Sequence, residues 1–347
     1  MRTPNYSILV AAAAFVIVVA GIQAAASLLI PFLLAAFIAI ICLSPLNWLT
    51  SKRVPTGAAV LIITLAIVVL GMVIATFIGT SVADFSENLP SYQERLKVLS
   101  GTTVNWLSGR GIDTSTQSLL SAFDPSAAMG MAGELMSGLG NVLTNTFLIV
   151  LTVIFLLIEA ATLPHKWKTL KNGAPSTKAF EKFIGSVSAY FVIKIWISLA
   201  TGIFIAIWLA VIGVDYPLLW GLVAFLFNFV PNIGSIIAAI PAILLALVQL
   251  GGGEALLAGL GYVIANVVMG NIIEPRFMGK GVGLSTLVVF LSLVFWGWVL
   301  GPVGMLLSVP LTMIVKLALE SRPDTQWLAI LLGPGITTEE PSNPDYS

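Results

Sequence analysis

A few charged and amide side chains lie at the ends of long apolar stretches, where ionisable groups are costly and usually serve a path, a relay or a gate. Glu274 and Arg276 flank a proline and follow Asn271 at the end of one stretch, while Glu159 and Lys194 lie near the ends of two others. We therefore expect a gating or coupling role for these five residues: Glu159, Lys194, Asn271, Glu274 and Arg276.

Each of these residues also has a plainer interpretation. Lys194 lies about one turn inside its apolar stretch, so its ammonium group could snorkel to the cytoplasmic interface or pair with Glu159. Glu274 and Arg276 are too close in sequence to face each other on one helix, and the intervening proline could simply end the helix there. The alternative is that they fix or gate discontinuous elements.

Several chemistries lack the residues they need. The chain has one histidine, His165, which lies among lysines, and one cysteine, Cys42, which lies in an apolar run. A thiolate or imidazole metal site, a disulfide and a serine-histidine triad are therefore not expected. The formal net charge is zero, which gives no basic field for nucleic acid. No GxxxxGK[ST] phosphate loop is present, and we expect a protein without cofactor that is not an enzyme.

Composition indicates that lipid surrounds most of the chain. Hydrophobic residues make up 58% of the 347 residues, charged residues only 9%, and the mean hydropathy is +1.02. A soluble domain is about 25% charged. Seven stretches have no charged side chain, namely 3–51, 54–83, 135–158, 195–214, 216–253, 255–273 and 281–315. Since about 20 apolar residues cross a bilayer, we predict an all-α polytopic membrane protein with about eight transmembrane helices.

The distribution of Lys and Arg predicts the orientation. Residues 164–189 carry five lysines and one acid, whereas residues 84–143 carry three basic and six acidic residues. Because positively charged loops stay in the cytoplasm, residues 164–189 should be cytoplasmic and residues 84–143 extracytoplasmic. With about eight spans, both termini should then be cytoplasmic. The first apolar stretch should be a retained membrane anchor that bends near Ser27–Pro31. The predicted organisation is three spans in 1–83, an extracytoplasmic helical segment in 84–143, a span in 144–163, a basic cytoplasmic loop with an amphipathic helix in 164–189, a transport core in 190–320 and a cytoplasmic tail in 321–347.

The extracytoplasmic segment 84–143 reads as short amphipathic helices, with Leu89, Tyr92, Leu96 and Leu99 at helical spacing. It is either a small cap packed on the membrane helices or a lid or partner-binding surface.

Two long apolar runs share an order of residues. In 216–250, an aromatic cluster precedes Pro231 and Gly234, and in 281–316 a second aromatic cluster precedes Pro302 and Gly304. A proline-glycine break followed by a further apolar half is typical of a discontinuous helix or re-entrant hairpin. Two such hairpins, separated by one crossing, would open to opposite faces, as alternating access requires. The alternative is that each run is one kinked or tilted helix.

The breaks could bind a solute, because non-helical backbone in a membrane must be buried or must line a wet cavity. Polar side chains around the breaks could equally cap the broken helices, and tryptophans are also common interface anchors. The candidate substrate-binding residues are Asn228, Pro231, Asn232, Gly234, Ser235, Trp296, Trp298, Pro302 and Gly304.

Four motifs give a specific resemblance. They are NFVPNIGS at 228–235, NIIEPRFMG at 271–279, GLST at 283–286 and VPLT at 309–312. The chain is similar to the autoinducer-2 exporter family over essentially its whole length. The resemblance implies a bacterial inner-membrane protein that forms homo-oligomers, with a pentamer as one option, and exports the small uncharged signal autoinducer-2 in quorum sensing. Other members resemble sodium/proton antiporters, so a cation/proton antiporter is the alternative.

Overall fold

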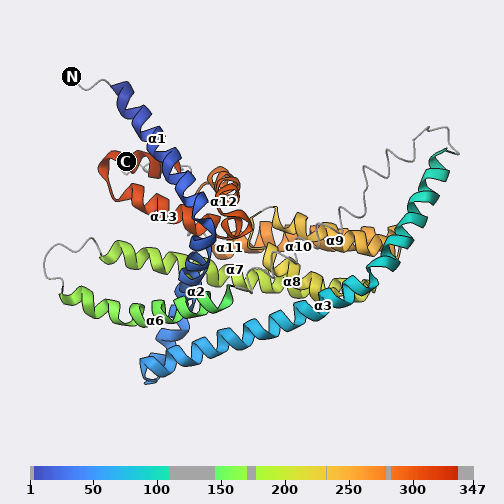
Figure 1. The fold of residues 1–347 in the computed structure, drawn as a ribbon, viewed down its shortest axis with the longest axis horizontal. Helices are drawn as coiled ribbons and strands as arrows, with labels where there is room; N and C mark the ends of the chain where they lie inside the picture. The colour runs from blue at the N-terminus through green and yellow to red at the C-terminus, as the bar shows by residue number, and fades with distance from the viewer. Residues whose placement is uncertain (1–3, 109–144, 170–176, 232, 279–282, 335–347) are drawn as a thin grey trace, which may run out of the picture. The chain divides into compact units, whose positions relative to one another are not determined.

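The computed structural model describes residues 4–108, 145–169, 177–231, 233–278 and 283–334, and within them the regular elements are all helical. This confirms the predicted all-α class (Figure 1). The chain forms two compact units. One comprises Met1–Ala26 together with Met278–Ser347, and the other comprises Ser27–Phe277.

Five of the described helices are long and apolar enough to cross a membrane. They cover Ala26–Ser51, Thr56–Phe85, Ile184–Ile212, Gly252–Phe277 and Thr286–Leu306. Four shorter apolar helical segments accompany them, at Ala12–Ala24, Thr146–Thr162, Pro217–Phe227 and Gly234–Gln249. The chain is therefore a polytopic membrane protein, while the number of eight crossings stays a prediction.

The first helices differ from the expected boundaries. Helix α1 covers Pro4–Ala24 and α2 covers Ala26–Ser51, so the break lies at residue 25, just before the expected bend at Ser27–Pro31, and Pro31 itself lies inside α2. A single proline removes one hydrogen bond, and an otherwise apolar helix can continue through it in a membrane. Helix α2 packs with α3 (Thr56–Ser108) and α6 (Thr146–Thr169) around a core that includes Ala35, Ala59 and Leu157.

Helix α3 continues without interruption from its span through residue 108, so the start of segment 84–143 is one long helix rather than several short ones. Residues 109–144 lie outside the described part of the chain. A continuous helix fits the regular three- and four-residue spacing of apolar side chains, with Phe85 and Tyr92 packed against the core of the second unit. Similarly, α7 (Thr177–Ile212) joins the expected amphipathic helix of 164–189 directly to the next span.

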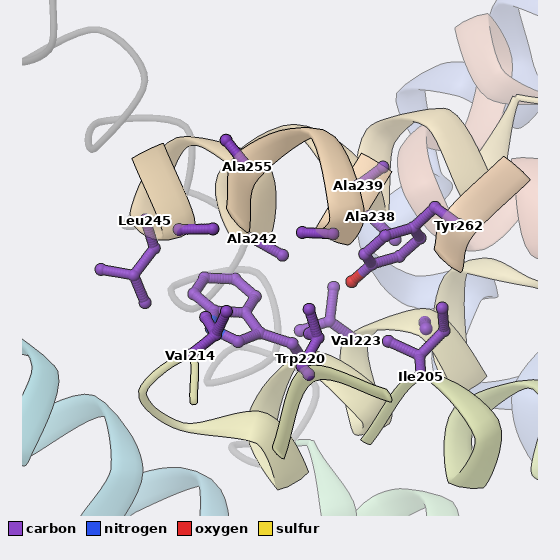
Figure 2. Close-up of a cluster of buried hydrophobic side chains, with 14 of the residues drawn as sticks. Ile205, Val214, Trp220, Val223, Ala238, Ala239, Ala242, Leu245, Ala255 and Tyr262 are labelled. Carbon is purple, nitrogen blue, oxygen red and sulfur yellow. The ribbon is translucent and has the colours of Figure 1, made fainter. Parts of the chain in front are cut away.

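The run 216–250 is a helical hairpin. It consists of α8 (Pro217–Phe227) and α9 (Gly234–Gln249), which at 1.5 Å per residue are roughly 16 and 24 Å long, less than the ~30 Å hydrocarbon thickness. The two helices pack side by side, and Trp220 and Val223 of α8 share one core with Ala238, Ala242 and Leu245 of α9 (Figure 2). The chain therefore reverses at the break instead of continuing as one kinked helix.

After the hairpin, α10 (Gly252–Ala265) packs against α9 and α7 and completes this core. It continues as a π-helix, η1 (Asn266–Ile273), in which the Glu274 amide donates to the Met269 carbonyl five residues back. The short helix α11 (Glu274–Met278) follows. Because a π turn holds one residue more than an α turn, it rotates the following residues by roughly 100° about the axis. π-Helical turns occur frequently at functional sites.

The run 281–316 also folds back on itself, in the other unit. Helix α12 (Thr286–Leu306) is interrupted at Gly301, whose φ of 66° and ψ of −152° are not helical, and α13 (Ser308–Glu320) follows. The indole N–H of Trp296 donates to the hydroxyl oxygen of Thr312 over 3.1 Å, although a straight helix would separate these residues by roughly 24 Å. The 3-10 turn η2 (Pro323–Thr325) and α14 (Gln326–Leu331) end the described chain.

Each hairpin contains a similarly close backbone contact at a glycine. A Cβ atom on Gly234 would overlap the carbonyl oxygen of Phe227, and one on Gly304 would overlap the carbonyl oxygen of Trp296. Gly234 therefore lets α9 begin directly against the Phe227 backbone, and Gly304, which follows the break at Gly301 within α12, lets the chain pass directly against the Trp296 backbone. The expectation that the two hairpins open to opposite faces stays a prediction.

Candidate functional site

Helix α7 carries a stripe of buried polar side chains in the middle of its membrane span. Lys194, Ser198 and Thr201 recur at helical spacing and are only 2%, 0% and 4% exposed. The rest of the span is strongly apolar, which is what makes it a membrane helix. Polar groups in such a position are costly, and they face the protein interior.

The Lys194 ammonium pairs with the Glu274 carboxylate of α11. Its Nζ lies 2.7 and 2.8 Å from the two carboxylate oxygens, and the side chains are 3% and 19% exposed. The expectations that Lys194 snorkels to the interface or pairs with Glu159 are therefore wrong. Lys194 lies ten residues inside the span Ile184–Ile212, roughly 15 Å from its start, and Glu274 directly follows the π turn of η1.

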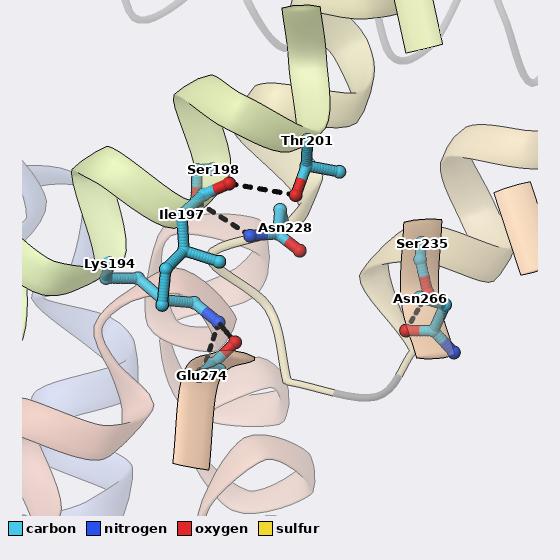
Figure 3. Close-up of polar contacts among 8 residues, drawn as sticks. All are labelled: Lys194, Ile197, Ser198, Thr201, Asn228, Ser235, Asn266 and Glu274. Carbon is cyan, nitrogen blue, oxygen red and sulfur yellow. Dashed lines mark hydrogen bonds and ion pairs between the residues drawn. The ribbon is translucent and has the colours of Figure 1, made fainter. Parts of the chain in front are cut away.

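The tip of the α8–α9 hairpin is hydrogen-bonded on both sides (Figure 3). The Asn228 side-chain amide donates to the Ser198 hydroxyl of α7 over 2.9 Å, and the Ser235 hydroxyl donates to the side-chain amide oxygen of Asn266 in η1 over 3.1 Å. The tip thus contacts α7, which carries Lys194, and η1, which leads directly into Glu274 at the start of α11. We call this set the polar seam, which comprises Lys194, Ser198, Thr201, Asn228, Ser235, Asn266 and Glu274.

The seam retains hydrogen-bonding capacity in its side chains. Within the part of the chain that the structure describes, neither the side-chain oxygen of Asn228 nor the side-chain nitrogen of Asn266 has a partner. The backbone of the break offers less, because the amides of Val230, Ile233 and Gly234 donate to nearby carbonyls. The seam is therefore suited to a molecule that both donates and accepts hydrogen bonds.

The charges of the seam cancel. Both carboxylate oxygens of Glu274 accept from Lys194, and the remaining seam side chains are neutral hydroxyls and amides. A small uncharged polar molecule that enters the seam would exchange its hydrogen bonds to water for bonds to these side chains. An ion would enter a poorly hydrated region without a free countercharge. Among the described residues, no cluster of three or more metal-binding side chains is present.

Other predicted residues of this unit lie apart from the seam contacts. Pro231 is half-buried in the break and Gly234 starts α9, while Asn232 lies outside the described residues. Asn271 and Arg276 are exposed, as is Glu159 of α6. Their gating or coupling role stays a prediction.

The predicted residues of the second hairpin belong to the other compact unit. Trp296 bonds to Thr312, and Gly304 is buried against the Trp296 backbone. Trp298 has 62% of its surface exposed and Pro302 is also exposed. The exposed indole of Trp298 fits a lipid-facing anchor better than a solute contact in this arrangement. A path shared between this hairpin and the seam stays a prediction.

Sequence reasoning missed Ser198 and Thr201, which lie inside an apolar run. The available signal was the spacing of Lys194, Ser198 and Thr201, which places one charge and two hydroxyls on a single helical face. Asn266 was not among the predicted site residues. Its pairing with Ser235 requires a contact between residues 31 positions apart, which no local pattern reveals.

The base of the hairpin, opposite the tip, is held by the extension of α3. The Tyr92 hydroxyl donates to the Asp215 carboxylate over 2.7 Å, and burial together with this bond raises the pKa of Tyr92. The Asn88 amide donates to the Tyr216 hydroxyl, and the Gln249 carbonyl accepts from Arg95. A cavity of about 580 Å³ lies beside this contact, lined by Ser91, Glu94, Arg95, Val98 and residues 247–251.

The chain is similar to known transporters over most of its length. The AI-2E family transporter model matches residues 8–323. The AI-2 transport protein TqsA of Escherichia coli K12 is 44% identical over 91% of this chain and 92% of its own length. A putative transport protein of Haemophilus influenzae is 42% identical, with 92% and 94% covered, and YhhT of Escherichia coli K12 is 37% identical, with 96% and 98% covered. The chain belongs to the AI-2E family of membrane transporters.

Proposed function

We propose that this transporter exports a small uncharged polar signal molecule, autoinducer-2, with the polar seam as its binding region. The observation that carries the proposal is a set of buried and half-buried neutral hydrogen-bonding groups, held at a hairpin tip beside a charge-compensated ion pair. The similarity to TqsA, whose name states AI-2 transport, supports this choice of solute.

The same arrangement supports gradient-driven alternating access. The first hairpin is built from helices shorter than the hydrocarbon thickness, as expected of a re-entrant element that can open a site to one side. The lysine-rich residues 164–189 favour cytoplasmic termini in a bacterial inner membrane, and residues 190–320 would form the transport core. In this scheme Lys194 and Glu274 hold the core together, and homo-oligomers of such units are expected from the family resemblance.

The test is solute flux in liposomes. Liposomes that contain the purified protein and are preloaded with labelled autoinducer-2 should release it faster than preloaded liposomes without protein. Asn228→Ala and Ser235→Ala should each slow release by up to about tenfold, since one hydrogen bond is worth about 0.5–1.5 kcal/mol and 1.4 kcal/mol is a factor of ten.

The matched control is Thr152→Val. Its hydroxyl bonds only to the Leu148 carbonyl within α6, so its loss should leave the flux unchanged. The absence of flux above empty vesicles under every imposed ion gradient would refute the proposed function. An equal loss of flux in Thr152→Val and Asn228→Ala would show that the polar seam does not bind the solute.

A further inference from the structure

Tyr262 of α10 lies in the centre of the core formed by α7, α8, α9 and α10. It is 4% exposed. Its ring and hydroxyl lie among Ala238 and Ala239 of α9, Val223 of α8 and Ile205 of α7 (Figure 2). These neighbours are all apolar, and those from α9 are small.

The Tyr262 hydroxyl is buried without a hydrogen-bond partner in the described structure. Such a group destabilises a fold, because it has lost its hydrogen bonds to water and gained none in return. Phenylalanine would fill nearly the same space without this cost. The hydroxyl is thus better explained by a partner that is present in another state of the protein.

The position of Tyr262 suggests which partner. It lies one helical turn before Asn266, and its neighbour Ile205 lies one turn after Thr201. The hydroxyl therefore lies about one helical turn from the polar seam, on the side towards the base of the hairpin. The alanines of α9 that cover it offer no branched side chains to obstruct a shift of that helix.

We propose that the Tyr262 hydroxyl is a second binding position for the transported solute, reached when α9 shifts away from α10, and that it selects neutral molecules bearing hydroxyl groups. This inference rests on the proposed transport of such a solute. Asn228 and Asn266 bind the solute first at the tip, and Tyr262 takes over one hydroxyl group as the solute moves deeper between the helices.

The experiment compares Tyr262→Phe with the wild type in stability and in flux. The variant should unfold at an equal or higher temperature in detergent, because it lacks the unpartnered hydroxyl. Its release of labelled autoinducer-2 from liposomes should fall by about tenfold, equivalent to one lost hydrogen bond to the solute. Its preference for autoinducer-2 over a furanone of similar size without hydroxyl groups should fall by the same factor.

Thr64→Val is the matched control. Thr64 of α3 carries the other buried side-chain hydroxyl that has no partner among the described residues. Its replacement should also preserve or raise the unfolding temperature, but it should leave flux and solute preference unchanged. A variant that gains stability and loses selective flux is expected only at Tyr262.

The outcomes separate the two proposals. If the wild type moves no autoinducer-2, the proposed function fails. If the wild type is active and Tyr262→Phe retains both its rate and its preference, only the second binding position is refuted. A lower unfolding temperature in Tyr262→Phe, with an unchanged preference between the two solutes, would show that the hydroxyl has a structural partner and would also overturn the inference.

Discussion

The ion pair between Lys194 and Glu274 predicts an unequal response to removing its two members. Breaking a buried pair leaves an uncompensated charge and typically costs 3–5 kcal/mol, whereas replacing both members is often close to neutral. We expect Lys194→Met and Glu274→Gln each to lower the free energy of unfolding. The double variant should recover most of the loss.

The exposures of the two side chains predict which single variant is the less stable. The Lys194 side chain is 3% exposed, so Glu274→Gln leaves an ammonium group with almost no access to water. The Glu274 side chain is 19% exposed, so the carboxylate left by Lys194→Met retains some hydration. We therefore expect about 5 kcal/mol for Glu274→Gln, about 3 kcal/mol for Lys194→Met and less than about 2 kcal/mol for the double variant.

Reversible unfolding in detergent micelles measures these differences, and a double-mutant cycle isolates the interaction between the two residues. A loss in Lys194→Met that equals or exceeds the loss in Glu274→Gln would contradict the burial argument. A double variant no more stable than the worse single variant would show that the side chains stabilise the protein separately, through other contacts.

Three further predictions concern packing and the hairpin base. Gly234→Ala and Gly304→Ala should each prevent their hairpin from closing and strongly reduce the yield of monodisperse protein in size-exclusion chromatography, because the new Cβ atom would overlap a backbone carbonyl oxygen. Gly202→Ala should cost about 1–3 kcal/mol in thermal unfolding, because its Cβ atom would lie 2.7 Å from the Gly221 carbonyl oxygen of α8. Tyr92→Phe should cost about 1.5–3 kcal/mol by removing the hydrogen bond to the Asp215 carboxylate, and should speed limited proteolysis of the α3 extension.

Each of these predictions has a control at a site without the critical contact. Gly253→Ala, Gly21→Ala and Gly185→Ala introduce a Cβ atom that meets nothing within 4 Å, and they should be tolerated. Thr80→Val removes only hydroxyl bonds to carbonyls of its own helix and should leave proteolysis unchanged. If Gly234→Ala folds like Gly253→Ala, the close backbone contact at Gly234 is not required. If Tyr92→Phe matches Thr80→Val, the α3 extension is held by its apolar contacts alone.

The sequence was sufficient to predict the membrane class and the two broken runs, because both depend on local properties. Charge-free stretches identify membrane helices, and a proline followed by a glycine predicts a break. The sequence left open whether each run turns back or only bends, since that depends on whether Gly234 and Gly304 admit an aromatic residue's carbonyl at close range. Such a fit appears only when both halves are placed in space.

The principal polar contacts could not be predicted in the same way. Lys194 and Glu274 are 80 residues apart, and the position of Lys194 near the predicted start of a span allowed snorkelling or a pair with Glu159 as well as a gating role. Helix α7 begins well before its apolar run, so the lysine lies deeper than the hydropathy pattern implied. The π-helix before Glu274 could not be predicted either, since its residues show no pattern that distinguishes them from an α-helix.

The contacts of the first hairpin indicate which of its ends can move at lower cost. At the base, five hydrogen bonds join three segments of the chain, namely Tyr92 to Asp215, Asn88 to Tyr216, Arg95 to the Gln249 carbonyl, the Asp215 amide to Gln249, and Gln249 to the Gly213 carbonyl. At the tip, single side-chain bonds from Asn228 and Ser235 connect it to α7 and η1. A solute with hydroxyl groups can replace both tip bonds, but it cannot replace the tertiary contacts of the base. The hairpin should therefore pivot about its base and open at its tip, where the polar seam lies.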